Sequence, residues 1–429
     1  MTEFELGELI LSSTPFAHVL SNEFRGQYCD YCFIKKDNLK RCSQCSFLYF
    51  CDKNCQVKAW EMHKTECKFI KKAGDKKPTP SLRLIALIIF KIKKYGTNEP
   101  SEDVYGRKVS FASLMSHAEE IKQDLKRCQI IMAMLITLKE YIGSDNLPPP
   151  AEFTEIFGKM CVNSFSICHE MSPIGSGLYL GASVFDHSCD PEAVAVFDGT
   201  TLNVRMMKKV PHRDIQKVFI SYVGELLLKE EKQRQLKEQY YFSCKCSYCI
   251  FSQNDDLMTK LFDDSVEVKE KALKCEGDLE SIKQMLNDQK DPELINDACS
   301  RLLEEENEVL GDTNIYKIRT LEIAFDTCIK LQAWDKAITL ASCLEEPLRL
   351  YFGTHHPSLG IFLFKYGKIL HFKEFSNVAV TKLSEAENVF KITHGEHHPL
   401  TKELESILHD AKLSSVFIDS KKELKCIKL

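Results

Sequence analysis

The sequence predicts a multidomain α+β protein that binds metal, and three observations lead to this prediction. Cysteines gather in two short clusters, a middle region (172–224) carries glycines among short apolar runs, and the chain from about Leu257 onward shows only helical patterns. At roughly 100–200 residues per domain, 429 residues predict two to four domains. A hydrophobic content of 44% and a net charge of −5 exclude a disordered chain and a uniformly basic nucleic-acid-binding protein.

The chain has 19 cysteines, and metal binding is the best explanation for those that are clustered. The first residues carry Glu3, Glu5 and Glu8 instead of a positively charged leader, and no apolar run reaches the roughly 20 residues that span a membrane. We therefore expect a protein of the nucleus and/or cytoplasm without a membrane partner, where disulfides do not persist. Six isolated cysteines are expected to be small buried hydrophobic residues: Cys128, Cys275, Cys299, Cys328, Cys343 and Cys426.

The first half of the chain combines a short strand with helices. The apolar residues of 8–11 predict a strand that ends in a turn at Thr14-Pro15. A basic, proline-containing linker is expected at 71–80. Helical patterns then cover 81–141 and, after three consecutive prolines, 151–171.

The second half changes from strands to helices. Short apolar runs predict strands at 193–197, 202–206 and 218–222, and a charged helix is expected at 225–240. The helical tail contains an internal repeat, because the His-His-Pro motif before Pro357 returns 42 residues later before Pro399. A period of this length predicts stacked, tetratricopeptide-like helix pairs. We interpret the paired histidines as turn and cap residues and not as a metal site.

The first cysteine cluster has the spacing of two zinc sites. Its eight ligands suffice for two tetrahedral ions, since structural zinc takes four Cys or His each. The pairs separated by three residues lie one helical turn apart on a single face. An interleaved arrangement follows, with one site formed by Cys29, Cys32, Cys51 and Cys55 and the other by Cys42, Cys45, His63 and Cys67.

This spacing, with Trp60 before the histidine, resembles the MYND zinc finger over the whole segment 29–67. The resemblance implies proline-rich peptides as partners and, in some members, DNA. Residues 29–80 carry 12 Lys/Arg against 6 Asp/Glu, and this basic excess could meet nucleic acid or acidic proteins. A merely solvated basic face is an equally good interpretation of the same charges.

The second cluster supplies three thiolates, Cys244, Cys246 and Cys249, and Cys189 from a distant loop is the candidate fourth ligand. The segments 187–191, 220–222 and 242–249 together resemble a SET domain with its post-SET cysteines. With a MYND finger near the start and helical repeats behind, the chain resembles the SMYD family of protein-lysine methyltransferases. The resemblance implies an N-terminal part of SET at 1–28, MYND at 29–67, the helical SET-I region and SET core at 68–240, post-SET at 241–252 and helical repeats at 257–429.

The family activity implied by this resemblance is methyl transfer from S-adenosylmethionine to a lysine of a histone or another protein, with three structural zinc ions. By resemblance, Tyr222 is the catalytic tyrosine. The lysine channel would be lined by Phe165 and Tyr240. The cofactor would be held by Asn163, Asp186, His187, Phe242 and His117.

The sequence also departs from the family on the cofactor side. It lacks the early Gly-x-Gly turn, Asp186 stands where the family has Asn, and 212–217 replaces the usual Gly-Glu-Glu-Leu. An ionised Asp only accepts hydrogen bonds, whereas Asn also donates. These changes favour an alternative, a SET-derived interaction protein with little or no turnover that recruits partners through MYND and the helical repeats. We expect a monomer, since no heptad seam or exposed apolar helix is evident.

Overall fold

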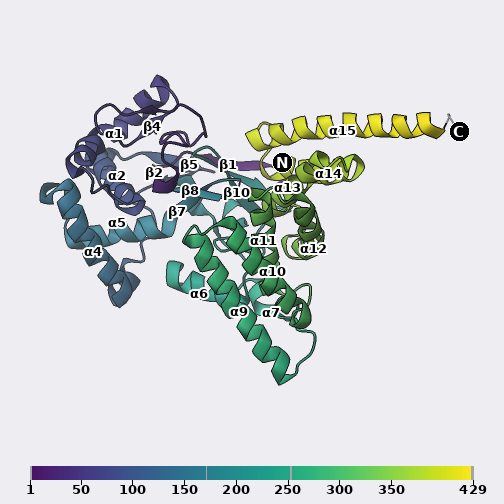
Figure 1. The fold of residues 1–429 in the computed structure, drawn as a ribbon. Coiled ribbons are helices and arrows are strands. Elements are labelled where there is room, and N and C mark those ends of the chain that lie inside the picture. The colour runs from purple at the N-terminus through teal and green to yellow at the C-terminus, as the bar shows by residue number, and fades with distance from the viewer. Residues whose placement is uncertain (1, 171, 252–253, 427–429) are drawn as a thin grey trace. The chain divides into compact units, whose positions relative to one another are not determined.

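The computed structural model describes residues 2–170, 172–251 and 254–426 (Figure 1). The chain forms two compact units that interleave in sequence. The first contains the residues up to His187 together with Pro191–Ile220 and Gln235–Ser243. The second contains Ser188–Asp190, Ser221–Arg234 and the chain from Cys244 onward.

Short sheets and helices build the first unit. Its strands are β1 (Leu9–Ser13), β2 (Ala17–Leu20), β3 (Lys40–Arg41), β4 (Tyr49–Phe50), β5 (Ser101–Val104), β6 (Arg107–Ser110), β7 (Ser164–His169), β8 (Ser172–Leu178), β9 (Asp186–His187), β10 (Ala193–Asp198), β11 (Thr201–Met206) and β12 (Phe219–Ile220). Its helices are α1 (Lys53–Ala73), α2 (Pro80–Tyr95), α3 (Ala118–Gln123), α4 (Leu125–Ile142) and α5 (Pro150–Asn163). One-turn 3₁₀ segments occur at Asn22–Phe24, Gly96–Asn98, Ser144–Asn146, Gly181–Val184 and Ile215–Lys217.

Two three-stranded antiparallel sheets have the orders β1-β11-β10 and β2-β8-β7. The remaining strands form two-stranded ladders, of which only β9 and β12 run parallel. The strands expected at 8–11, 193–197 and 202–206 are confirmed by β1, β10 and β11. The strand expected at 218–222 is reduced to the two residues of β12.

Two of the expected helical stretches are wrong in part. Within 81–141, β5 and β6 form a hairpin whose two turn residues, Tyr105 and Gly106, have φ of 53° and 82°. A two-residue turn with positive φ matches the twist of the paired strands, and glycine adopts this conformation at little cost. The helix expected over 151–171 ends at Asn163, because the alternating residues that follow pair as β7 with β8.

The second unit is helical. It consists of α7 (Ser247–Phe251), α8 (Asp255–Met258), α9 (Val266–Asn287), α10 (Pro292–Val309), α11 (Ile315–Lys330), α12 (Trp334–Phe352), α13 (Pro357–Phe372), α14 (Ser376–Thr393) and α15 (Pro399–Cys426). The expected charged helix is α6 (Lys229–Tyr240), which begins in the second unit and ends in the first.

Each helix from α9 to α15 packs on the next around one apolar core (Figure 1, green to yellow). The 42-residue period is visible in the helix starts, since α12 and α14 begin at Trp334 and Ser376, and α13 and α15 at Pro357 and Pro399. The histidines before these prolines act as caps, as expected. The backbone N–H of Ser358 donates to His356 Nδ1, and that of Leu400 donates to His398 Nδ1, each at 3.2 Å.

The exposure of several side chains differs from the predictions. Cys275, Cys299 and Cys328 are buried as expected, whereas Cys343 is exposed and Cys128 is half-buried, so those two predictions are wrong. The prediction that the chain has no exposed apolar helix is also wrong, because in α4 the side chain of Leu125 is 79% exposed and those of Met132 and Ile136 are 61% exposed. Across the described residues, none of the helices combines the length and apolarity that crossing a membrane requires.

Candidate functional site

The first set of zinc ligands combines Cys29 and Cys32, which precede β3, with Cys51 and Cys55, where β4 leads into α1. The ligand atoms of Cys29, Cys32, Cys51 and Cys55 all lie within 4.8 Å of one another. The sulfurs of Cys32 and Cys51 are 3.5 Å apart. A tetrahedral zinc ion with Zn–S bonds of about 2.3 Å needs sulfurs a little under 4 Å apart, so this set fits the metal. The side chain of Asp52 accepts from the N–H of Cys55 at 2.8 Å and caps the helix that presents the fourth ligand.

The second cluster is fully buried and pairs with the first in the expected interleaved order. Cys42, Cys45, His63 and Cys67 place their ligand atoms within 4.8 Å of one another. His63 Nε2 lies 3.5 Å from Cys45 Sγ, and the other ring nitrogen, Nδ1, lies 3.6 Å from Glu66 Oε2. A carboxylate behind the ligating histidine is the usual arrangement for orienting such a ring.

Glu66 also accepts two hydrogen bonds from the guanidinium of Arg83 in α2, one at each carboxylate oxygen, at 2.7 and 3.2 Å. Arg83 Nη1 lies 3.8 Å from Asp30 Oδ1. Burial alone would raise the pKa of Glu66, but the Arg83 guanidinium outweighs it and holds that pKa at about 2. The zinc finger and α2 therefore share one buried, charge-paired contact.

A third ligand set lies in the second unit. Cys189, Cys244, Cys246 and Cys249 bring their sulfurs within 4.8 Å of one another, and those of Cys189 and Cys249 are 3.5 Å apart. Gln233 exchanges two hydrogen bonds with the backbone of Cys244, at 2.9 and 3.0 Å, and so fixes the start of the cysteine turn. Together the three sets fit three zinc ions.

The first unit contains most of the residues named by the family resemblance, and several of them are linked by contacts to one another or to their chain neighbours. The buried amide of Asn163, at the end of α5, donates to the carbonyls of Met115 and Lys159 at 3.0 and 2.8 Å. His117 follows Met115 in the same loop, and its ring centroid lies 5.4 Å from that of Tyr241.

The next residue, Phe242, makes further contacts. Its ring centroid lies 6.0 Å from that of His187 on β9 and 6.4 Å from that of Tyr240. Burial raises the pKa of Tyr240. Residues far apart in the sequence thus form one aromatic and polar cluster.

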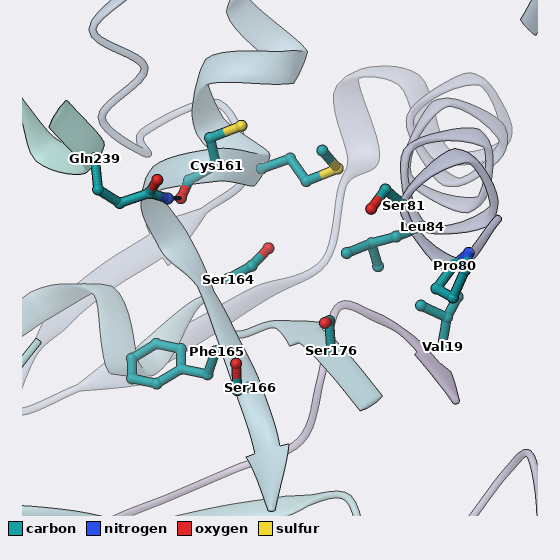
Figure 2. A pocket seen from close by; sticks show the side chains of 11 residues that line it. Val19, Pro80, Ser81, Leu84, Cys161, Ser164, Phe165, Ser166, Ser176 and Gln239 are labelled. Carbon is teal, nitrogen blue, oxygen red and sulfur yellow. Dashed lines mark hydrogen bonds between the residues drawn. The ribbon is translucent and has the colours of Figure 1, made fainter. Parts of the chain in front are cut away.

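Phe165 lines a pocket of about 200 Å³ (Figure 2). Its walls come from β2, β7, β8 and the ends of α2, α5 and α6; the lining residues are Val19, Pro80, Ser81, Leu84, Met160, Cys161, Ser164, Phe165, Ser166, Ser176 and Gln239. Gln239 Nε2 donates to the carbonyl of Cys161 at 2.7 Å and joins α6 to α5. Among the described residues, the buried Ser164 Oγ has no hydrogen-bond partner.

The two other predicted residues lie on β9 and in the segment after β12. Asp186 is exposed on β9, where it pairs in register with Phe219 of β12. Tyr222 belongs to the second unit, in the irregular segment that follows β12. Sequence reasoning missed Gln239 and Arg127, whose Nη2 donates to the Gln239 side chain at 3.0 Å. The only signal for Gln239 was its position directly before Tyr240.

Comparisons with known proteins agree with this architecture. The MYND finger family matches residues 29–67. The human protein named histone-lysine N-methyltransferase SMYD3 is 33% identical over 96% of this chain and 94% of its own length. Human N-lysine methyltransferase SMYD2 is 26% identical over 94% of this chain and 92% of its own, and mouse histone-lysine N-methyltransferase Smyd1 is 27% identical over 94% and 85%. The full-length match, the finger and the zinc clusters together show that this chain belongs to the SMYD family of lysine methyltransferases.

Proposed function

We propose that this protein is an S-adenosylmethionine-dependent protein-lysine N-methyltransferase that acts on a lysine of a histone or another protein. The observation that supports it most is a set of three contacts in the first unit, of Asn163 with Met115, of His117 with Tyr241 and of Phe242 with His187. It joins four separate segments that resemble the cofactor-binding residues of the family. The names of the full-length relatives support the same activity.

The proposal includes the domain assignment: an N-terminal part of SET at 1–28, MYND at 29–67, SET-I and SET core at 68–240, post-SET at 241–252 and tetratricopeptide-like repeats at 257–429. The 42-residue offset between helix starts supports the last of these. Proline-rich peptides are the proposed partners of the finger, and the nucleus and/or cytoplasm the proposed location.

The side chains of the cluster have the chemical character that binding of S-adenosylmethionine requires. Asn163 and His187 are 7% and 9% exposed and supply buried polar groups. The ring of His187 lies beside that of Phe242, which in turn lies beside Tyr240. Aromatic faces attract a sulfonium cation, and buried amides recognise polar groups of a ligand. When bound, S-adenosylmethionine would supply the electrophilic methyl group.

The proposed roles of this chain's own residues concern the lysine. An ammonium ion has no lone pair, so the lysine must lose its proton before it attacks. Phe165 and Tyr240 would line a channel whose apolar walls lower the lysine pKa by disfavouring the charged form. Tyr222 is the proposed catalytic tyrosine, with its hydroxyl orienting the amine. Asp186 would lie beside the cofactor, where an ionised carboxylate can only accept hydrogen bonds.

The alternative is a SET-derived interaction protein that does not turn over. Asp186 favours it, because an ionised carboxylate at this position cannot donate a hydrogen bond to a carbonyl. In that case the MYND finger and the helical unit would recruit peptide partners.

Isothermal titration of the zinc-loaded protein with S-adenosylmethionine separates the two. Micromolar binding, followed by methyl transfer to histone-tail peptides that Tyr222→Phe abolishes, would support the enzyme. An absence of binding up to millimolar cofactor, on folded protein, would favour the interaction protein.

A further inference from the structure

The proposed catalytic Tyr222 lies in an irregular segment, Ser221–Leu228, between β12 and α6. Just before it, Ile220 is held in the parallel ladder opposite His187. Within the segment, Ser221 Oγ donates to the carbonyl of Val223 at 2.7 Å, a short-range bond that cannot anchor the loop to the rest of the molecule. The contacts that hold the chain directly after Tyr222 therefore help to fix where the tyrosine lies.

His356 provides one anchor. Its Nε2 lies 3.2 Å from Glu225 Oε1, with the two side chains 8% and 23% exposed. Because its Nδ1 accepts the N–H of Ser358 as a helix cap, the proton of the neutral ring is on Nε2, which donates to the carboxylate. Phe352 stacks on the imidazole at a centroid distance of 4.7 Å and fixes the plane of the ring. Burial raises the pKa of Glu225, but the neighbouring His356 outweighs it and the pKa lies below its ordinary value.

Arg319 of α11 provides the second anchor. Its Nη2 donates to the carbonyl of Leu226 at 2.8 Å and to Glu231 Oε2 at 2.8 Å, while Nη1 lies 3.3 Å from Glu231 Oε1. Glu231 in turn accepts the N–H of Leu228 at 2.8 Å. The side chain of Leu226 packs against the apolar core of the helical repeats. A planar guanidinium suits such a multidentate contact, and here it is only 12% exposed.

We infer that Arg319 and His356, two residues of the helical repeats, are positioning residues for Tyr222, acting through Leu226, Glu231 and Glu225. This inference rests on the proposed function, in which Tyr222 is the catalytic tyrosine. The anchored chain begins three residues after Tyr222, so movement of Glu225 is transmitted to the tyrosine through a short connection. Displacing a reacting group by about 1 Å can cost about a hundredfold in rate. The helical repeats would thereby influence the turnover number.

His356→Asn tests the first anchor. Asparagine is a good helix cap, so α13 keeps its N-terminus, but its side chain is too short to reach Glu225. His398→Asn is the matched control, because His398 caps α15 in the same way 42 residues later. Steady-state kinetics should show kcat lowered about tenfold or more by His356→Asn, with the affinity for S-adenosylmethionine within about twofold of wild type. Equal kinetics for the two variants would overturn the inference.

Further variants test the Arg319 anchor and the hydrogen bond between His356 and Glu225. Arg319→Lys keeps the charge near Glu231 but loses the fork that reaches Leu226, and it should lower kcat with little change in cofactor affinity. Glu225→Gln keeps an acceptor oxygen for the His356 N–H, so it should retain most of the activity that Glu225→Ala loses. A Gln variant as poor as the Ala variant would contradict the hydrogen-bond role of Glu225.

Amide hydrogen exchange gives a readout that does not depend on turnover. Peptides covering 221–228 should exchange about tenfold faster or more in His356→Asn and Arg319→Lys, and at the wild-type rate in His398→Asn. If wild-type protein transfers no methyl group, the proposed function fails, while the exchange data still decide whether the loop is anchored. Unchanged exchange in both anchor variants would overturn the anchoring itself.

Discussion

Glu66 of the zinc finger and Arg83 of α2 form a bidentate ion pair in the interior of the first unit, with side chains only 1% and 3% exposed. The same carboxylate faces the ring nitrogen of His63 that points away from Cys45. One residue thus connects a zinc ligand to the helix that follows the finger. The finger and α2 are expected to lose their structure together.

Arg83→Met should be strongly destabilising. It leaves the buried carboxylates of Glu66 and Asp30 without their cation, and breaking a buried pair from one side costs about 3–5 kcal/mol. Lys94→Ala is the control on the same two helices, since Lys94 pairs with Glu61 at 44% and 59% exposure and should cost less than about 1 kcal/mol. Chemical denaturation of both variants gives the comparison. Similar midpoints for the two would show that the buried pair contributes little.

Metal analysis of purified protein should find three zinc ions per chain. Cys189→Ser should lower this to two, because it removes the ligand that comes from outside the Cys244–Cys249 turn. Cys343→Ser, at an exposed cysteine outside all three clusters, should leave three. Fewer than two ions in the wild type would refute the zinc assignment.

Asp186→Asn should strengthen the binding of S-adenosylmethionine. Asn adds a donor where the carboxylate only accepts, and one hydrogen bond contributes about 0.5–1.5 kcal/mol, or up to about tenfold in affinity. Asp198→Asn, at the end of β10, is the charge-matched control and should leave the affinity unchanged. Calorimetric titration measures both. Weaker binding by Asp186→Asn would indicate that the carboxylate itself holds the cofactor's ammonium group.

The buried Glu306 should make the second unit less stable as the pH rises. Burial raises its pKa from 4.5 to about 7, against the opposing effects of Thr320 and Lys317. The folded protein therefore binds this proton more tightly than the unfolded chain, so stability falls between about pH 4.5 and 7. The total loss is roughly 3 kcal/mol. Denaturation of wild type and Glu306→Gln across this range should show the variant gaining relative stability with pH, and a constant difference would contradict the assignment.

Two glycine substitutions should have opposite signs. A methyl group at Gly367 of α13 would lie 2.7 Å from the Leu383 side chain and 3.3 Å from its backbone nitrogen, so Gly367→Ala should cost about 1–3 kcal/mol by overpacking. Gly277 of α9 faces open space, so Gly277→Ala should stabilise by roughly 0.5–1 kcal/mol through helix propensity. Thermal unfolding tests both. A stabilising Gly367→Ala would show that α13 and α14 pack less closely than described.

The zinc sites could be predicted because their information is local. Cys-x-x-Cys pairs and the His63/Cys67 turn place ligands on one ion whatever surrounds them, and the structure groups them as the spacing indicated. The caps of α13 and α15 were equally local, since a side chain two residues before the donor makes the bond. The β5–β6 hairpin was missed because its turn signal, Tyr105-Gly106, lies within a long, mainly helical pattern.

The sequence by itself determined the family, the metal ligands, the helical second half and the identity of the proposed catalytic residues. Only the tertiary structure decided that Phe165 lies on a strand, that His187 contacts Phe242, and that Arg319 and His356 contact the loop after Tyr222. Backbone geometry determines which residues close in sequence can meet, so their spacing in the sequence predicts short-range contacts. Contacts across 90 or more residues depend on how whole helices pack, and no local spacing records that packing.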